Sequence, residues 1–335
     1  MSKPARAGES AEDRLIARHF KPIARHPGAY GLTDDAAVLT PPAGHSLVVT
    51  ADAVVGGVHF FADDPPDAIA RKALRVNLSD LAAKGAQPAG FLLTLALPKG
   101  FRDDWLKAFA RGLGKDAKAY DCPLLGGDTV HTPGPVTISI AAFGTLPEGT
   151  MVRRAGARPG DHVIVTGTIG DAALGLKLRK ERGASKRWRL DAAMQRHLLA
   201  RYLVPEPRNA LAEALRLNAS AAMDVSDGLA GDLGKLCRAS GVGAEIEVAR
   251  VPLSKAALAA LDADPKAIEP ILTGGDDFEV VAAIPPAVLD VFLTAARVVG
   301  VPVTVIGQVT AGKAARLLGA GGRPLRFARA SFSHF

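Results

Sequence analysis

The sequence predicts an α/β protein, in the broad α+β sense of mixed helices and strands, built as two domains. A chain of 335 residues is too long for a single ordinary core. A composition of 48% hydrophobic and 22% charged residues is that of a globular protein and argues against a disordered chain. The expected helices and strands are mixed rather than strictly alternating, so a simple doubly wound sheet does not follow.

The first half of the chain carries most of its elements in clear patterns. Residues 9–26 are amphipathic with helical spacing, and Ser10 is the expected N-cap. Residues 66–85 have apolar side chains at helical spacing and predict a long helix. The other elements expected here are strands at residues 36–39, 46–51 and 91–97, a helix at 103–120, a short strand ending at Leu125, and a strand at 136–143.

The composition changes at residues 146–161, where LPEGTMVRRAGARPGD brings prolines, glycines and arginines together. We take this segment as the boundary between domains at residues 1–148 and 149–335. The second domain is expected to open with a strand at 162–166, a turn at 167–170 and a helix from Asp171. Further helices are expected at residues 208–216 and 229–240, and strands at 221–225, 244–248, 280–284 and 303–309.

Several classes of protein are excluded by what the chain lacks. Cys122 and Cys237 are far apart and fit no metal-ligand spacing, so neither a disulfide framework nor a thiolate zinc site is expected. The N-terminus has no apolar core typical of a signal peptide. The longest apolar stretch, residues 91–98, is far shorter than the about 20 residues that cross a bilayer. We therefore expect a cytoplasmic protein with no membrane partner.

The net charge of +7 is compatible with nucleic acid, an anionic substrate or no charged partner at all. The densest basic run, residues 177–189, contains Trp188 and is a conceivable nucleic-acid contact. No stacking platform or recognition motif accompanies it, so a solvated helix with its following loop is the favoured interpretation. No nucleic-acid partner is expected.

Aspartates flanked by small residues recur where apolar strands end or begin. They are Asp34, Asp35, Asp52, Asp128, Asp224, Asp227, Asp276 and Asp277, with Asp80 in the apolar stretch VNLSDLAAKG. Each alone is explained by a turn or a helix cap. If they converge, however, they would repel one another unless cations lay between them. Carboxylates with few His or Cys partners favour Mg²⁺, which bridges protein carboxylates and substrate phosphates.

Glycines give a second, weaker indication of phosphate binding. The runs GGD at residues 126–128 and 274–276 permit close backbone approach, and residues 167–170 open a helix whose N-terminus favours anions. Neither a Walker A sequence nor a protein-kinase glycine loop with its catalytic-loop partner is present. Arg153 and Arg154 either clamp a phosphate or are ordinary loop charges. No Ser–His–Asp elbow, HExxH motif or cysteine nucleophile supports a hydrolase, and His59, taken alone, is more typical of a structural histidine.

In order and spacing, the motifs resemble the thiamine-monophosphate kinase family of the aminoimidazole ribonucleotide synthetase-like superfamily. The matching stretches, which span nearly the whole chain, are TDDAAVL, VVTADAVVGGVHF, ALRVNLSDLAAKGAQP, LLGGDT, RRAGARPGD, VTGTIGDAALGL, MDVSDGLAGDLG, LTGGDDFE and SFSHF. The resemblance implies an N-terminal α/β domain for ATP and metal binding, whose sheet pairs across a homodimer into a β-barrel, and a C-terminal α+β domain. It implies an ATP and metal cleft between the domains. It also implies Mg²⁺-dependent transfer of the ATP γ-phosphoryl group to thiamine monophosphate, giving thiamine diphosphate and ADP.

The resemblance also assigns roles to individual residues. It implies metal ligands at Asp35, Thr50, Asp52, Asp80, Asp128, Asp224 and Asp227. It implies ATP contacts at Gly127, Asp128, Arg154 and Ser226, and substrate contacts at His59, Asp276 and Phe332. No catalytic side chain is implied, because the acceptor phosphate is already a nucleophile and is largely deprotonated at neutral pH.

Three positions depart from the family pattern. Thr33 stands where a glycine is usual, Ala51 removes a hydroxyl beside Thr50, and Asp276 stands where Glu is frequent. These changes affect local geometry but remove none of the principal carboxylates. The alternatives are another ATP-dependent enzyme of the superfamily and a non-catalytic nucleotide-binding sensor. The first cysteine comes only at Cys122 and the chain ends in His334-Phe335, which disfavours selenophosphate synthetase and a hydrogenase-maturation protein respectively.

Overall fold

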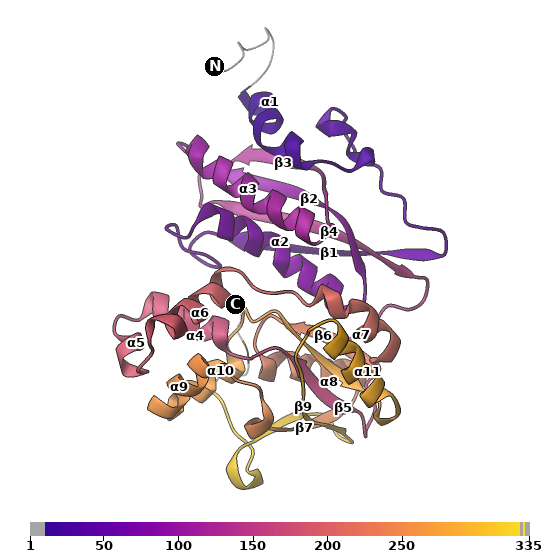
Figure 1. Ribbon diagram of the computed structural model, residues 1–335, viewed down its shortest axis with the longest axis vertical. Coiled ribbons are helices and arrows are strands. Elements are labelled where there is room, and N and C mark those ends of the chain that lie inside the picture. The colour runs from indigo at the N-terminus through magenta and orange to yellow at the C-terminus, as the bar shows by residue number, and fades with distance from the viewer. Residues whose placement is uncertain (1–10, 329–330, 332–335) are drawn as a thin grey trace. The chain divides into compact units, whose positions relative to one another are not determined.

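The computed structural model describes residues 11–328 and 331, and the chain divides into two compact units (Figure 1). Unit 1 comprises Met1–Asn77 and Pro88–Thr145, and unit 2 comprises Leu78–Gln87 and Leu146–Phe335. The main division lies shortly before the boundary that the sequence predicts. The assignment of Leu78–Gln87 to unit 2 has no counterpart in the sequence analysis.

Unit 1 is built on a four-stranded sheet of order β1-β4-β2-β3, in which β2 and β3 run parallel. The strands are β1 (His45–Val55), β2 (Gln87–Leu97), β3 (Leu124–His131) and β4 (Thr137–Pro147). The α-helices are α1 (Ala11–Leu15), α2 (Pro66–Ala83) and α3 (Asp103–Ala119). A π-helical turn at Ile16–Phe20 and 3₁₀ turns at Lys21–Ile23 and Pro27–Leu32 follow α1.

Helices α2 and α3 cover one face of this sheet (Figure 1). Accordingly, buried and half-buried residues alternate along the whole of β4, as expected of a strand with one face in the core. The two helices approach closely at Gly112, where a Cβ would lie 2.3 Å from the Asp67 carbonyl oxygen. Arg71 and Arg75 on α2 pair with the buried carboxylate of Asp116 on α3, which fixes how the two helices pack.

Unit 2 is built on a six-stranded mixed sheet of order β10-β7-β9-β5-β8-β6. The strands are β5 (His162–Thr166), β6 (Ala221–Val225), β7 (Gly243–Glu247), β8 (Glu279–Ile284), β9 (Val303–Thr310) and β10 (Ala315–Leu318). The α-helices are α4 (Asp171–Lys180), α5 (Ala184–Arg187), α6 (Ala192–Leu203), α7 (Ala212–Asn218), α8 (Leu229–Ser240), α9 (Lys255–Ala263), α10 (Ile268–Thr273) and α11 (Leu289–Val298). The 3₁₀ turns are Asn209–Leu211, Val248–Arg250, Pro265–Ala267, Pro286–Val288 and Ala320–Gly322.

Both faces of the unit 2 sheet are buried, and each has its own core. All six residues of β8 are buried; Val281 and Ala283 pack with α4, α6, α8 and α9, whereas Val280, Ala282 and Ile284 pack with α7 and α11. This explains why β5, β6 and β8 are continuous apolar runs in the sequence rather than alternating ones.

The end of α2 belongs to unit 2 because its backbone and side chains are held there. Asn209 donates to the Leu78 carbonyl at 3.1 Å, and Lys84 Nζ donates to the Ala222 carbonyl at 2.8 Å. At Gly85 the chain takes φ +75°, and a Cβ there would lie 2.7 Å from the Arg216 Cβ. A glycine is therefore required for this segment to pack on α7.

Most elements expected from the sequence are confirmed, but three predictions are wrong. The helix expected at residues 9–26 is α-helical only over Ala11–Leu15; it continues as a π-helical turn and then as a 3₁₀ turn ending at Ile23, where Pro22 lacks the N–H of a regular α-helix. Residues 36–39 form no strand; they lie along the wall of a pocket, and Pro41 and Pro42 follow at once. The strand expected to end at Leu125 instead begins at Leu124 and continues through His131, because β2 pairs with its whole length. Helices α5, α6, α9, α10 and α11 and strand β10 were not predicted. The expected N-cap Ser10 lies outside the described residues.

Candidate active site

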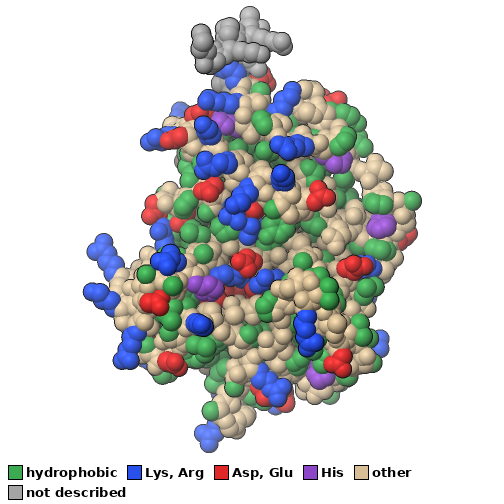
Figure 2. All heavy atoms as spheres, in the orientation of Figure 1, with side chains coloured by type: hydrophobic (Ala, Val, Ile, Leu, Met, Phe, Trp, Pro, Cys, Tyr) green, Lys and Arg blue, Asp and Glu red, His purple; other side chains and the backbone are tan. Residues whose placement is uncertain are grey.

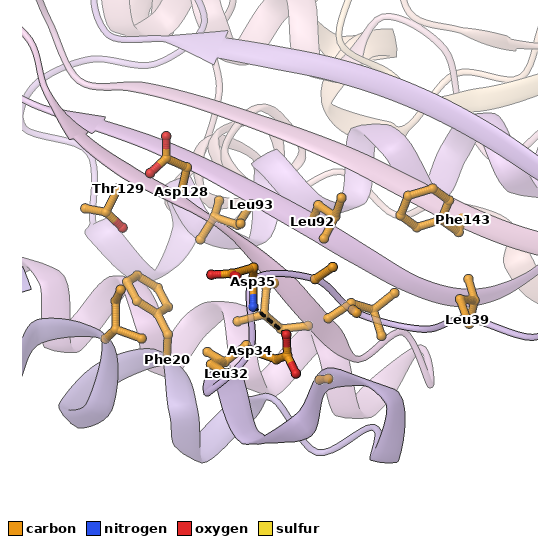
Figure 3. A pocket seen from close by; sticks show the side chains of 18 of the residues that line it. Phe20, Leu32, Asp34, Asp35, Leu39, Leu92, Leu93, Asp128, Thr129 and Phe143 are labelled. Carbon is orange, nitrogen blue, oxygen red and sulfur yellow. Dashed lines mark hydrogen bonds between the residues drawn. The ribbon is translucent and has the colours of Figure 1, made fainter. Parts of the chain in front are cut away.

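Unit 1 contains a pocket of about 630 Å³ in which acidic and glycine residues meet an apolar wall (Figure 3). Asp34 and Asp35 enter it from the segment before β1, and Gly126, Gly127 and Asp128 enter it from β3. Its apolar lining includes Ile16, Phe20, Leu32, Leu39, Leu47, Leu92 and Phe143. Asp35 and Asp128 therefore line the same pocket of unit 1. The hypothesis that the acids converge requires such an arrangement.

The position of Asp128 depends on the glycine before it. Gly127 has φ +150°, and a Cβ there would lie 1.8 Å from the Leu93 carbonyl oxygen. Gly127 pairs with Leu93 and Asp128 with Thr94 in the parallel register of β2 and β3. The glycine thus lets the strand continue, and Asp128 lies within β3 rather than after it. Thr129 also lines the pocket and was not predicted.

The Asp34-Asp35 segment is shaped by the residues before it. Tyr30, Gly31 and Leu32 have positive φ, whereas Thr33 has φ −116° and its hydroxyl donates to the Tyr30 carbonyl at 2.7 Å. The absence of a glycine at position 33 therefore imposes no left-handed strain there. The Asp34 carboxylate accepts the Asp35 N–H at 2.8 Å, which orients the pair.

The other predicted residues of unit 1 lie on β1 and the turn after it, and none of them lines this pocket. Thr50 and Asp52 are on β1, and the Asp52 N–H donates to the side chain of buried Asn77 at 3.0 Å. His59 Nδ1 accepts the Val55 N–H at 3.0 Å, and its carbonyl accepts from Lys72 Nζ at 3.0 Å. His59 therefore closes the turn after β1, which is a structural contribution, and the same contact makes its Nδ1 an acceptor.

In unit 2, Ser226 and Asp227 follow β6 and lie beside the loop that carries Asp276. The Asp276 N–H donates to the Ser226 carbonyl and the Phe278 N–H to the Val225 carbonyl, both at 2.8 Å. Asp276 and Phe278 have φ of +75° and +49°, a region that non-glycine residues occupy only when their surroundings hold them there. Thus, Asp276 is brought beside Ser226 and Asp227, from which it is far removed in the sequence.

Asp80, Arg154 and Asp224 share the surroundings of Lys84, also within unit 2. Burial lowers the pKa of Lys84. The negative charges of Asp224 and Asp80 act to raise this pKa, whereas the positive charge of Arg154 acts to lower it further. Asp224 is buried in β6 opposite Val280. Arg154 is exposed, and its carbonyl accepts from Ser240 at 3.0 Å. Lys84 was not singled out in the sequence, where a lysine near a helix end is typical of a solvated residue.

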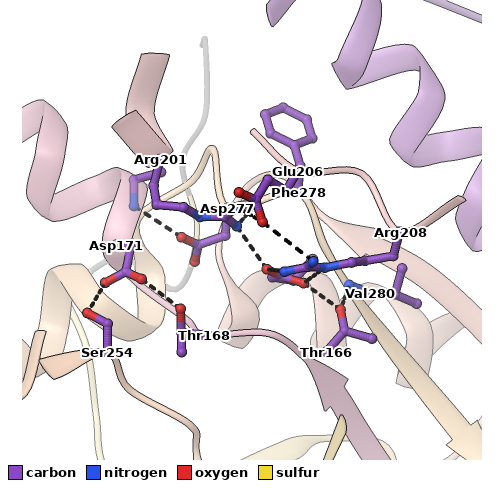
Figure 4. Close-up of polar contacts among 12 residues, drawn as sticks. Thr166, Thr168, Asp171, Arg201, Glu206, Arg208, Ser254, Asp277, Phe278 and Val280 are labelled. Atoms are coloured by element: carbon purple, nitrogen blue, oxygen red, sulfur yellow. Dashed lines mark hydrogen bonds and ion pairs between the residues drawn. The ribbon is translucent and has the colours of Figure 1, made fainter. Parts of the chain in front are cut away.

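The loop bearing Asp276 is supported by a buried ionic network (Figure 4). Glu279, fully buried, accepts from Arg201 Nη2 at 2.8 Å, from Arg208 Nε at 2.6 Å and from Thr166 Oγ1 at 2.6 Å. Arg201 also donates to the Asp277 carbonyl at 3.2 Å, which ties the network to the loop.

Asp277 occupies the N-terminus of α4. Its carboxylate accepts the Gly170 N–H at 2.7 Å and the Ala172 N–H at 3.3 Å. Burial raises the pKa of Asp277 well above its ordinary value, against these two backbone donors. The helix N-terminus that the sequence offered as an anion site is therefore filled by a carboxylate of the chain itself.

Next to it, Asp171 is fully buried and accepts from His197 at 2.8 Å, from Thr168 at 2.7 Å and from Ser254. Burial acts to raise the pKa of Asp171, but these hydrogen bonds lower it below its ordinary value. The hydrogen bond to Asp171 raises the pKa of His197. None of this group was predicted, because a Ser, a Thr and a His scattered over 87 positions leave no local motif.

The acidic side chains of the unit 1 pocket supply oxygen donors of the kind that Mg²⁺ prefers. Among residues 11–328 and 331, no three or more His, Cys, Asp or Glu side chains form a ready-made metal site. Magnesium usually binds one or two carboxylates and completes its shell with water and substrate phosphates, so a preformed cage is not required. The all-oxygen donors Asp34, Asp35 and Asp128 in one pocket fit that chemistry. Asp227 does not fit as well, because Lys235 pairs with its carboxylate.

The basic run at residues 177–189 does not form a nucleic-acid stacking surface. Trp188, in the basic run, is 1% exposed and offers no stacking surface. On the face shown in Figure 2, basic side chains are scattered among acidic and neutral ones.

Both cysteines are buried, and burial raises the pKa of Cys122 to about 12 and that of Cys237 to about 11, which argues against a thiolate nucleophile. No helix in the described part of the chain is long and apolar enough to cross a membrane. Phe332 lies outside the described residues.

The comparisons with known proteins agree on one family. The sequence matches the AIR synthase related protein N-terminal domain over residues 33–146 and the corresponding C-terminal domain over residues 158–319. It is 44% identical to the thiamine-monophosphate kinase of Caulobacter vibrioides over 92% of this chain and 87% of that protein.

Two solved structures give the same result. The crystal structure of thiamine-monophosphate kinase from Stenotrophomonas maltophilia matches with a TM-score of 0.81 and 37% identity, over 93% of this chain and 96% of that one. The structure of AaThiL complexed with AMPPCP and TMP matches with a TM-score of 0.76 and 29% identity, over 92% and 97% of the two chains. The mixed two-domain fold is therefore that of the AIR synthase related proteins. On the identity and coverage of these relatives, the chain belongs to the thiamine-monophosphate kinase family.

Proposed function

We propose that this protein transfers the γ-phosphoryl group of ATP to thiamine monophosphate, giving thiamine diphosphate and ADP. Family membership supports the reaction, and the AaThiL complex with AMPPCP and TMP supports the pair of substrates. The observation that carries the proposal within this structure is the pocket of unit 1, where Asp35, Gly127 and Asp128 meet beside an apolar wall.

The pocket has the features that ATP binding requires. Its volume of about 630 Å³ lies in the range of ligand sites. Gly126 and Gly127 line the pocket, and as glycines they add no side chain of their own between a phosphate and the backbone. The leucines and phenylalanines of the wall suit the apolar faces of a nucleotide. In unit 2 we assign Arg154 and Ser226 as further ATP contacts, a guanidinium and a hydroxyl that suit phosphate oxygens.

We assign Mg²⁺ to the aspartates. In unit 1 the proposed ligands are Asp35, Thr50, Asp52 and Asp128, and in unit 2 they are Asp80 and Asp224. When bound, Mg²⁺ supplies the positive charge that offsets the repulsion between two anionic phosphates. The carboxylate of Asp227 pairs with Lys235 instead.

The residues of the chain act by alignment rather than by covalent chemistry. The acceptor phosphate is itself the nucleophile, so no side chain has to form a bond or remove a proton. His59, Asp276 and Phe332 are the proposed contacts of thiamine monophosphate. The loop at residues 274–278 holds Asp276 in its strained conformation through the Ser226 and Val225 carbonyls and the Arg201 bridge. Asp276 is one methylene shorter than glutamate, and this fixed backbone sets how far its carboxylate extends.

We also propose a cytoplasmic homodimer, in which the unit 1 sheet pairs with its counterpart into a β-barrel. Val49 supports this, because it lies on the edge strand β1, is 58% exposed and does not line the pocket. Sedimentation of the wild type as a dimer and of Val49→Lys as a monomer is expected. A wild type that sediments as a monomer at micromolar concentration would contradict the proposal.

The function is tested by following ADP formation with ATP and Mg²⁺ present, with and without thiamine monophosphate. We expect ADP only when thiamine monophosphate is added, together with one thiamine diphosphate for each ADP. ADP formed equally without the acceptor would point to another substrate of the superfamily. Nucleotide binding with no turnover on any phosphorylated acceptor would point to a non-catalytic sensor.

A further inference from the structure

Lys235 on α8 lies between two acidic side chains of unit 2. Its ammonium donates to Asp227 Oδ2 at 2.5 Å and to Asp232 Oδ1 at 2.8 Å. The other oxygen of Asp232 accepts the backbone N–H of Asp227 at 2.8 Å. The three side chains and this N–H form a closed ring of hydrogen bonds at the start of α8.

The ring is partly shielded from water. The Asp232 side chain is 0% exposed, whereas those of Lys235 and Asp227 are 29% and 34% exposed. A carboxylate buried as deeply as that of Asp232 needs a positive partner, and Lys235 supplies it. The lysine is therefore held from both sides, in contrast to an ordinary surface ion pair.

An ammonium group and a divalent cation cannot both occupy the space between these two carboxylates. Lys235 is three residues after Asp232 on the same helix, so its ammonium is present at high local concentration without any binding step. Mg²⁺ gives up its water reluctantly and would have to displace this ammonium. The geometry thus favours the lysine, although the family pattern offers Asp227 as a metal ligand.

We propose that Lys235 is a built-in cation that takes the place of a metal ion at Asp227, so that Asp227 binds no divalent metal in this protein. This rests on the proposed function, in which the other aspartates hold Mg²⁺. Lys235 acts as a positioning residue. Through Asp227 and Asp232 it fixes residues 226–228, whose Ser226 carbonyl accepts the N–H of Asp276. Residues 226–228 and the backbone of Asp276 are then ordered before any metal binds.

The test counts Mn²⁺ ions bound per chain by electron paramagnetic resonance, on the full-length protein without nucleotide. We expect Asp227→Asn to bind as many ions as the wild type, and Lys235→Arg likewise. Lys235→Met should bind one more ion than the wild type, and the double variant Lys235→Met/Asp227→Asn should lose that extra ion. Circular dichroism checks that each variant is folded.

The proposal is overturned if Asp227→Asn binds one ion fewer than the wild type, or if folded Lys235→Met binds no additional ion. The ion count of Asp227→Asn does not depend on the stability of Lys235→Met. Thiamine diphosphate formation by the wild type is measured in parallel. A wild type that makes none contradicts the proposed function, whereas the ion counts still decide the role of Lys235.

Discussion

Replacing Glu279 by glutamine should destabilise unit 2 strongly while leaving its shape unchanged. In the wild type, Glu279 Oε1 accepts from Arg201 and Arg208, and Oε2 accepts from Arg208 and Thr166. Glutamine has one acceptor oxygen and one NH₂ group that only donates. In either orientation the NH₂ therefore meets a guanidinium N–H.

The size of the effect follows from burial. The side chains of Glu279, Arg201 and Arg208 are 0%, 7% and 15% exposed, so water cannot replace the lost negative charge. Removing one member of a buried ion pair costs about 3–5 kcal/mol. The matched control is Glu181→Gln, because Glu181 also pairs with two cations, Lys177 and Arg187, but its side chain is 38% exposed. We expect the control to cost no more than about 1 kcal/mol.

The assay is urea unfolding monitored by tryptophan fluorescence in a Trp105→Phe background. The chain has two tryptophans, so buried Trp188 then reports on unit 2. We expect the unfolding midpoint of Glu279→Gln to move far below that of Glu181→Gln, with a similar slope. If the two variants lose the same free energy of unfolding, within about 1 kcal/mol, the buried network does not stabilise unit 2 as described.

Two further predictions concern the pocket and the response to pH. Gly127→Ala forces its Cβ against the Leu93 carbonyl and should cost on the order of 1–3 kcal/mol. Gly126→Ala meets only the end of the Leu92 side chain at 3.4 Å, and in thermal unfolding it should lie close to the wild type. The hydrogen bond to Asp171 raises the pKa of His197 in the folded state. The stabilisation of the fold by protonated His197 is therefore complete below about pH 6.5 and is lost as the pH rises through the folded-state pKa. His197→Gln should therefore remove up to about 1 kcal/mol at pH 5.5 and less at pH 8.5, and an equal loss at both pH values in urea titrations would refute the assignment.

The parts of the fold that the sequence predicted well are those in which local pattern and tertiary packing agree. Strand β6 and helix α8 were expected at the bounds found, because their apolar runs end at turn residues. Ala-rich helices such as α9 escaped prediction, since alanine gives little amphipathic contrast. The prediction that a strand ends at Leu125 is wrong because glycines commonly interrupt strands. At Gly127 the close approach of the Leu93 carbonyl shows instead that the glycine lets β3 pair with β2.

The residue types of the site could be predicted from the sequence, but the cationic side chains that pair with its acids could not. Asp35 and Asp128 could be nominated as acids with the same chemistry, and they line one pocket. The cations that accompany the acids of unit 2 could not be found in this way. Lys84 and Lys235 resemble ordinary helix-surface lysines in the sequence, and their importance depends on which carboxylates the fold brings to them. Arg201 and Glu279 are likewise 78 positions apart, so no local motif joins them.

The central claim, direct transfer to a phosphate acceptor with the aspartates as the essential groups, is tested most directly with ATP labelled in its γ-phosphoryl group. We expect the label to appear in the terminal phosphate of thiamine diphosphate, with no labelled protein after rapid quenching, and product formation to collapse in Asp128→Asn. Labelled protein that passes its label to thiamine monophosphate, or full activity in Asp128→Asn, would contradict the account.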